Sequence, residues 1–182
     1  MKRLFSIVSI GLLTGIAVVS MTAHADSRKK KVETVRAWLS GYEEVQGATQ
    51  TSGAIGAVSS AGRGFFRAVI DEDAGTIEYS YTYDGVANIT QSHLHFGQHH
   101  TQGGITVFLC TNLAPPANVP VPQPCPASPG QITGTITAQN VIATAGLNGF
   151  DKLLDAIRHE AVYVNLHSQA FPGGEIRGQL QH

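Results

Sequence analysis

Apolar and polar residues alternate through most of this chain, and this period of two restricts the fold more than any other feature. Within Arg63–Ile70, for example, Phe66, Ala68 and Ile70 lie on one face of a strand, and the other face carries Arg63, Phe65, Arg67 and Val69. Side chains of a strand point to opposite faces in turn, so the alternation predicts strands with one buried face. The same reasoning predicts strands at Val35–Leu39, Ile77–Tyr83, Ile89–Phe96, Ile105–Leu109, Gln131–Ile136, Ala161–His167 and Glu175–Gln181.

Turn residues separate these short strands at intervals of roughly ten residues, which is typical of antiparallel sandwiches and barrels. The period changes once. Phe150, Leu153, Leu154 and Ile157 follow the i, i+3, i+4, i+7 spacing of an amphipathic helix, and Asn148 is the expected N-cap. The pattern therefore predicts an all-β fold with one short helix, an antiparallel Greek-key-like β-sandwich or barrel.

The first 25 residues have the three parts of a secretion signal. Lys2 and Arg3 give a positive start, Leu4–Met21 is almost continuously apolar, and Ala23–Ala25 supplies the small-x-small cleavage pattern. The alternative is a membrane anchor that is not cleaved, because the apolar run is nearly long enough to span a bilayer. The cleavage pattern favours a signal peptide, and with it a periplasmic or secreted protein.

Cleavage after Ala25 leaves a basic, flexible N-terminal tail at residues 26–34 and one domain at residues 35–182. This exported part carries ten basic and thirteen acidic residues. The acidic balance argues against a nucleic-acid partner, which requires a basic face. No membrane span is expected after cleavage, and an unknown protein or matrix partner stays open.

Two cysteines occur in the chain, Cys110 and Cys125, and both lie in the exported part. An isolated pair in an oxidising compartment usually forms a disulfide. The alternatives are a two-thiolate metal site and two free thiols. The intervening segment contains five prolines and is typical of a stiff loop rather than a metal knuckle, which favours the disulfide.

Three histidines have the spacing of a metal site. His93 and His95 are two apart on one predicted strand, so they project to the same side, opposite to the apolar residues of that strand. His167 ends a later predicted strand and also lies opposite to its apolar residues. If the two strands are neighbours, the three imidazoles converge on an outer or mouth-facing surface. Such a set suits copper or zinc. The alternative is that the rings only form hydrogen bonds with the backbone and with neighbouring side chains.

Other aromatic and charged residues allow both a functional and a structural interpretation. Trp38 and a tyrosine row could line a binding face, but such a row is more often cross-strand packing; the row is Tyr79, Tyr81 and Tyr83. Glu175 and Arg177 lie two apart and could form a polar rim beside the histidines. An exposed ion pair or cross-strand pair that stabilises the last strand is the favoured interpretation of these two residues.

Four segments together resemble the CHRD domain, a module first described in chordin and common in exported bacterial proteins. They are Leu39–Val45 (LSGYEEV), Ser92–Gly97 (SHLHFG), Gly103–Cys110 (GGITVFLC) and Tyr163–Leu180 (YVNLHSQAFPGGEIRGQL). The resemblance covers nearly all of the exported part. It implies a β-sandwich-like domain outside the cytoplasm, and it implies no particular reaction.

The histidine pattern is also similar to that of copper–zinc superoxide dismutases. By this similarity His93, His95 and His167 match three copper ligands, and His99 or His100 takes the place of the bridging ligand. The aspartate-containing zinc set is not recognisable. The leading hypothesis is a non-enzymatic exported binding or structural module that holds copper or zinc. The alternatives are a copper redox enzyme of the dismutase type and a metal-free protein-interaction module.

Overall fold

The computed structural model describes residues 32–49 and 53–182. The strands are β1 (Val32–Ser40), β2 (Gln46–Thr49), β3 (Gly53–Ile55), β4 (Arg63–Asp71), β5 (Thr76–Asp84), β6 (Ile89–Phe96), β7 (Gly104–Thr111), β8 (Gly130–Ile136), β9 (Val162–Ser168) and β10 (Ile176–Gln179). The helices are the 3-10 turns η1 (Gly41–Glu43) and η2 (Ala138–Asn140) and the α-helix α1 (Phe150–Arg158).

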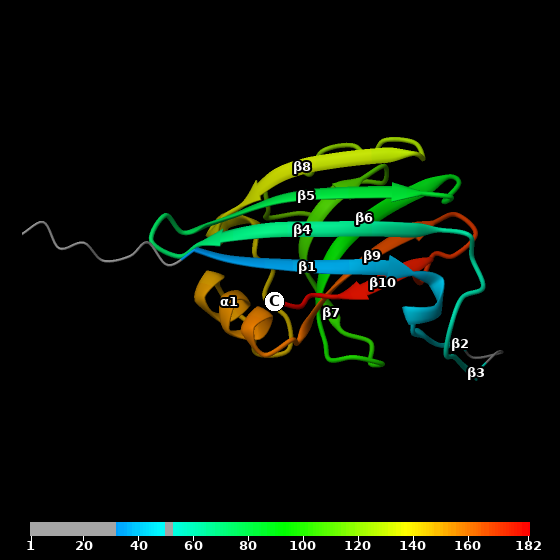
Figure 1. Ribbon diagram of the computed structural model, residues 1–182, viewed down its shortest axis with the longest axis horizontal. Helices are drawn as coiled ribbons and strands as arrows, with labels where there is room; N and C mark the ends of the chain where they lie inside the picture. The colour runs from blue at the N-terminus through cyan, green and yellow to red at the C-terminus, as the bar shows by residue number, and fades with distance from the viewer. Residues whose placement is uncertain (1–31, 50–52) are drawn as a thin grey trace, which may run out of the picture.

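Eight of the strands form one antiparallel sheet in the order β7-β6-β9-β10-β1-β4-β5-β8, and β2 and β3 form a separate pair. The large sheet curls until its two end strands, β7 and β8, contact each other, so it nearly closes into a barrel (Figure 1). Hairpins such as β4–β5 alternate with crossings between strands that are not neighbours in the sheet, such as β5 to β6, which four residues join. The predicted all-β class with one helix is confirmed.

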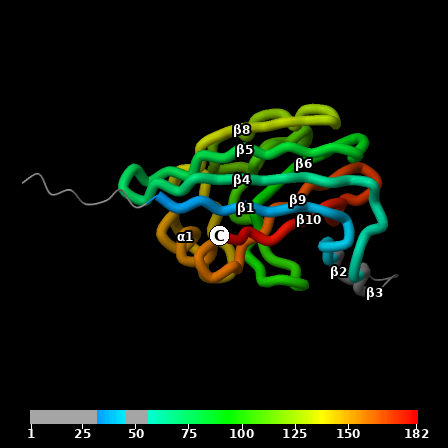
Figure 2. The backbone as a smooth tube through the Cα atoms, in the orientation of Figure 1, coloured from blue at the N-terminus to red at the C-terminus, as the bar shows by residue number. Residues whose placement is uncertain are grey.

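The first and the last described residues both lie at or beside β1. The predicted signal peptide, residues 1–25, lies outside the described residues. The predicted tail was too long, because β1 begins at Val32 and residues 32–34 are therefore strand. The chain ends beside β1, where Arg36 and Gln181 form an isolated bridge (Figure 2). In the described part of the chain, no helix has the length and apolar character needed to cross a membrane.

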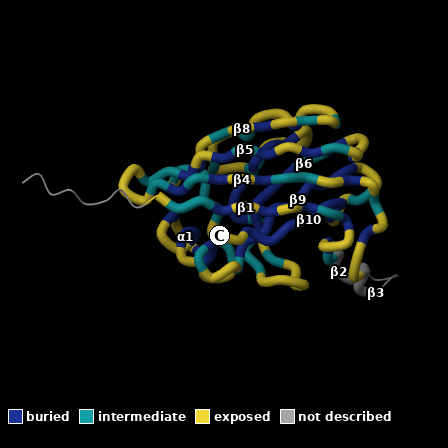
Figure 3. The backbone as a smooth tube through the Cα atoms, viewed as in Figure 1, coloured by how far each residue is buried: buried dark blue, intermediate teal, exposed yellow. Residues whose placement is uncertain are grey.

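The core lies inside the curled sheet, on the face that the alternation predicted. Phe66, Ala68 and Ile70 of β4 belong to it, as do the tyrosines of β5 and the predicted apolar stripe of α1. Buried and exposed segments accordingly alternate along β1 and β4 (Figure 3). The predicted helix cap was wrong: Gly149 rather than Asn148 occupies the N-cap position, with a φ of 112° that favours glycine.

Cys110 and Cys125 form the predicted disulfide, which ties the end of β7 to the proline-rich loop. The bond closes a loop of 15 residues, for which the chain-entropy model gives about 3 kcal/mol. We expect Cys110→Ala/Cys125→Ala to lower the free energy of unfolding by about this amount, measured by urea unfolding. Reduction of the wild-type protein should give the same loss, and an unchanged unfolding midpoint after reduction would contradict the prediction.

Candidate metal centre

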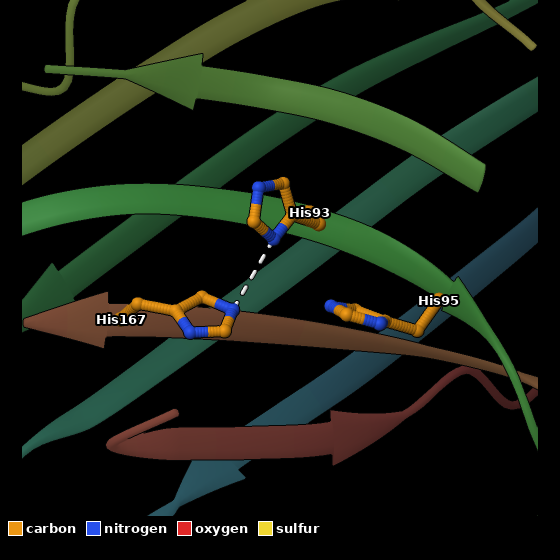
Figure 4. Close-up of side chains that lie close together, drawn as sticks. All are labelled: His93, His95 and His167. Carbon is orange, nitrogen blue, oxygen red and sulfur yellow. Dashed lines mark hydrogen bonds between the residues drawn. The ribbon is translucent and has the colours of Figure 1, made fainter. Parts of the chain in front are cut away.

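The three histidines come together because β6 and β9 are hydrogen-bonded neighbours. His93 and His95 lie on β6 and His167 lies on β9, and the antiparallel register places His93 opposite Asn165. One nitrogen from each ring lies within 4.8 Å of the others, and Figure 4 shows the rings turned toward one another. The predicted convergence is confirmed, and the rings lie on the opposite face of the sheet from core residues such as Leu94.

The expected exposure of these rings was wrong. The exposed fractions of His93, His95 and His167 are 0%, 7% and 6%. All seven residues of β9 are buried, so both faces of this strand are covered. The cover includes the 97–103 loop, whose Gly103 carbonyl accepts a hydrogen bond from His95, and the 171–174 turn, whose Pro172 carbonyl accepts one from His167. The ring of Phe108 on β7 contacts His93, with 4.3 Å between ring centres.

These two carbonyls decide which nitrogens can bind a metal. A carbonyl oxygen only accepts hydrogen bonds, so the Nδ1 atoms of His95 and His167 carry the protons, at 3.0 and 2.9 Å from their acceptors. The Nε2 atom of each ring therefore carries a lone pair. Backbone carbonyls hold metal-ligating histidines in this way in many proteins.

The ring nitrogens that do not donate to these carbonyls have the spacing of ligands to one metal ion. Nδ1 of His93 lies 3.2 Å from Nε2 of His167. Two nitrogens at this separation and about 2.1 Å from one ion subtend roughly 100° at it, close to the tetrahedral angle. The Nε2 atom of His95 is buried and has no hydrogen-bond partner in the described part of the chain. The Nε2 atom of His93 is also buried and unpartnered among the described residues, but it lies on the side of its ring away from His167 (Figure 4). Two nitrogens bound to one ion lie at most about 4.2 Å apart, because each is about 2.1 Å from the ion. Binding therefore draws the most widely separated pair of ligand nitrogens together by up to roughly 0.6 Å.

Burial keeps the three rings uncharged. Burial, reinforced by the neighbouring histidines, lowers the pKa of His93 to about 2. Burial is also the main cause that lowers the pKa of His95 to about 4, with contributions from His167 and Arg177 against the opposing Gly103 hydrogen bond. The pKa of His167 is lowered by burial as well. Neutral imidazole is the form that binds a metal, so the site is preorganised for an ion near neutral pH.

Arg177 fixes the cover over the histidines. Its guanidinium lies 3.5 Å from the ring centre of Tyr163, and that ring stacks on His95 with 4.8 Å between ring centres. The same guanidinium donates hydrogen bonds to the carbonyls of Gln98 and Thr101, in the covering loop. Arg177 is only 2% exposed, so the favoured interpretation as an exposed ion pair is wrong.

A buried carboxylate beside the cluster was not predicted. Glu44 is 2% exposed and accepts hydrogen bonds from the side chain of Asn165 and from the Val45 amide. Burial raises the pKa of Glu44, whereas these hydrogen bonds and the charge of Arg177 lower it. Gly174 lies against Glu44 and Asn165 with a φ of +130°, and a side chain there would collide with both. Asn165 and His167 are two residues apart and therefore lie on the same face of β9. This spacing was the sequence feature that could have predicted the extension of the polar cluster to Asn165.

Three other predicted site residues do not join the cluster. His99 and His100 are exposed in the covering loop, and their rings contact each other rather than the three histidines. Glu175 is 6% exposed and accepts a hydrogen bond from Ser60. Among the described residues, no ion pair joins Glu175 to Arg177.

The comparisons with known proteins give one result. The family model described as "CHRD domain" matches residues 35–180, which include every element of the candidate site. A comparison with curated proteins found no match.

Proposed function

This chain belongs to the CHRD domain family, and from that premise we propose that it is an exported, non-catalytic module that binds copper through His93, His95 and His167. The observation that carries the proposal is the convergence of one nitrogen from each of three buried imidazoles, within 4.8 Å of one another (Figure 4), with the Nε2 atom of His95 buried and unpartnered among the described residues. A buried polar atom without a partner is costly, and a metal ion relieves that cost.

The electrostatics of the site favour copper in its reduced form over zinc. All three ligands are neutral imidazoles, so the charge of the ion is not offset by a ligand. The positive charge of Arg177 also acts on His95. A buried ion of single charge is desolvated at lower cost than a divalent ion, and imidazole suits copper as well as zinc.

Burial of the ligands favours binding over catalysis. A copper redox enzyme needs an open coordination position that its substrate reaches, whereas His93 is fully buried. Four cavities of the described chain are lined by other residues, and none of the three histidines borders any of them. The disulfide supports an oxidising compartment.

Competition with a Cu(I) chelator such as bicinchoninate measures the affinity directly. We expect the purified protein to bind one Cu(I) per chain and to prefer it to Zn²⁺. The double variant His93→Gln/His95→Gln should bind at least about a hundredfold more weakly, because it removes two of three ligands. The matched control is His99→Gln/His100→Gln, which changes two exposed histidines and should stay within about twofold of the wild type.

Circular dichroism on both variants separates loss of ligands from loss of fold. Equal copper affinity in the two double variants would overturn the proposal, as would no binding by the folded wild type. Tighter binding of Zn²⁺ would overturn the choice of copper. Removal of superoxide by the loaded protein, above a free-copper control, would favour the redox enzyme instead.

A further inference from the structure

A row of four outward-facing residues crosses the sheet on the side away from the core. The register aligns Trp38 of β1 with Phe65 of β4, then Thr82 of β5 and Gln131 of β8. Trp38 is 72% exposed, and its ring centre lies 4.3 Å from that of Phe65. The two rings form an aromatic platform with polar side chains beside it.

The platform borders a cavity of about 570 Å³ that runs toward β8. All four residues of the row line it, and so do Arg63 and Asp84, which form an ion pair 2.6 Å apart. A volume in this range holds a small ligand. Single exposed apolar residues are common on protein surfaces, but here the tryptophan stands at the mouth of a cavity with hydrogen-bonding groups on its wall.

Two exposed arginines on the other side of the platform supply positive charge. Arg36 and Arg67 lie directly opposite each other on β1 and β4, and both are exposed. Like charges in this position destabilise a sheet. Among the described residues no carboxylate forms an ion pair with either arginine, although Glu78 of β5 faces the same side one row further along.

We propose that this face binds an acidic polysaccharide, with a sugar ring stacked on Trp38 and its carboxylate held by Arg36 and Arg67. The apolar face of a pyranose suits an exposed aromatic ring. Arginine binds carboxylates through paired hydrogen bonds. The short polar side chains and the Arg63–Asp84 pair offer both donors and acceptors to sugar hydroxyls. This site is independent of the histidine cluster, which lies on β6 and β9.

Isothermal titration with tetragalacturonate, a short uronic-acid polymer, tests the proposal. We expect Trp38→Ala to bind at least about tenfold more weakly, with Trp38→Phe in between. Arg36→Gln/Arg67→Gln should lose about tenfold and also the preference over neutral galactose oligomers. The matched control is Tyr42→Ala, an equally exposed aromatic residue outside the cavity, which should stay within about twofold.

Because Trp38 is mostly exposed, its replacement should cost only the cross-strand pair with Phe65, about 1 kcal/mol or less, and leave the protein folded. Failure of the folded wild type to bind at millimolar sugar, or equal affinity in Trp38→Ala, would overturn the proposal. Equal binding of the neutral oligomer would overturn the assignment to acidic sugars. A dimer that Trp38→Ala converts to a monomer, without any sugar affinity, would show that a second copy of the chain occupies this face.

Discussion

We expect the metal-free protein to unfold when the pH falls from about 7 to about 4. In the folded protein the pKa is lowered to about 2 for His93 and to about 4 for His95, mainly by burial, whereas an unfolded chain titrates its histidines near pH ~6.5. Below that pH the unfolded state binds protons that the folded state rejects. Stability is therefore lost as the pH falls toward the folded pKa values.

The expected loss is comparable to the stability of a whole domain. Each of the two histidines removes about 3 kcal/mol from the free energy of unfolding by pH ~4, and His167 is shifted in the same direction. Domains of this kind are stable by about 5–15 kcal/mol. Glu44 acts in the opposite sense, because its raised pKa lets the folded state gain a proton as the pH falls. The three histidines together outweigh this single carboxyl group.

Urea unfolding at a series of pH values measures this effect. Two to three protons taken up on unfolding correspond to a slope of about 3–4 kcal/mol per pH unit between pH ~6 and ~4.5. The variant His93→Leu/His95→Phe removes two of the titrating groups and should reduce the slope to about one proton. The exposed pair His99→Gln/His100→Gln should leave it unchanged. Wild-type stability that stays flat from pH 7 to 4.5 would contradict this explanation.

The strands were predictable because their signal is local. Alternation alone marked the face of β4 that carries Phe66, Ala68 and Ile70, and it placed His93 and His95 on the opposite side of β6 from Leu94. A period of two is a direct consequence of the pleat, and it survives whatever lies next to the strand. The side of the sheet on which His93, His95 and His167 lie was therefore correct from the sequence.

The burial of the histidines was not predictable, because it depends on segments distant in the chain. The polar row of β9 has the composition of a solvated face, yet Asn165 and His167 are covered by the 97–103 loop and the 171–174 turn. Loops of this kind have no periodic signal. Gly103 gives a partial hint: a side chain there would collide with the Phe96 carbonyl, so the close approach of this loop to β6 requires glycine.

The charge that holds this cover in place should be among the most costly to remove. We expect Arg177→Met to lower the free energy of unfolding by about 2–4 kcal/mol, because two partly buried carbonyls lose hydrogen bonds to a charged donor, each worth about 1.5–3 kcal/mol. The substitution leaves the Gln98 and Thr101 carbonyls without these donors and removes the charge that attracts Glu44. It also frees the covering loop, so amide hydrogen exchange at residues 97–103 should accelerate, and bound metal should exchange faster.

The matched control is Arg67→Met, which replaces an exposed arginine that has no ion pair among the described residues and should change stability by less than about 0.5 kcal/mol. Adding Glu44→Gln to Arg177→Met removes the uncompensated carboxylate and should restore part of the loss, because the two charges are coupled. Chemical unfolding of the wild type, the single variants Arg177→Met and Glu44→Gln, and the double variant measures this coupling. A loss below about 1 kcal/mol in Arg177→Met, or strictly additive effects, would mean that packing against Tyr163 rather than charge holds the cover closed.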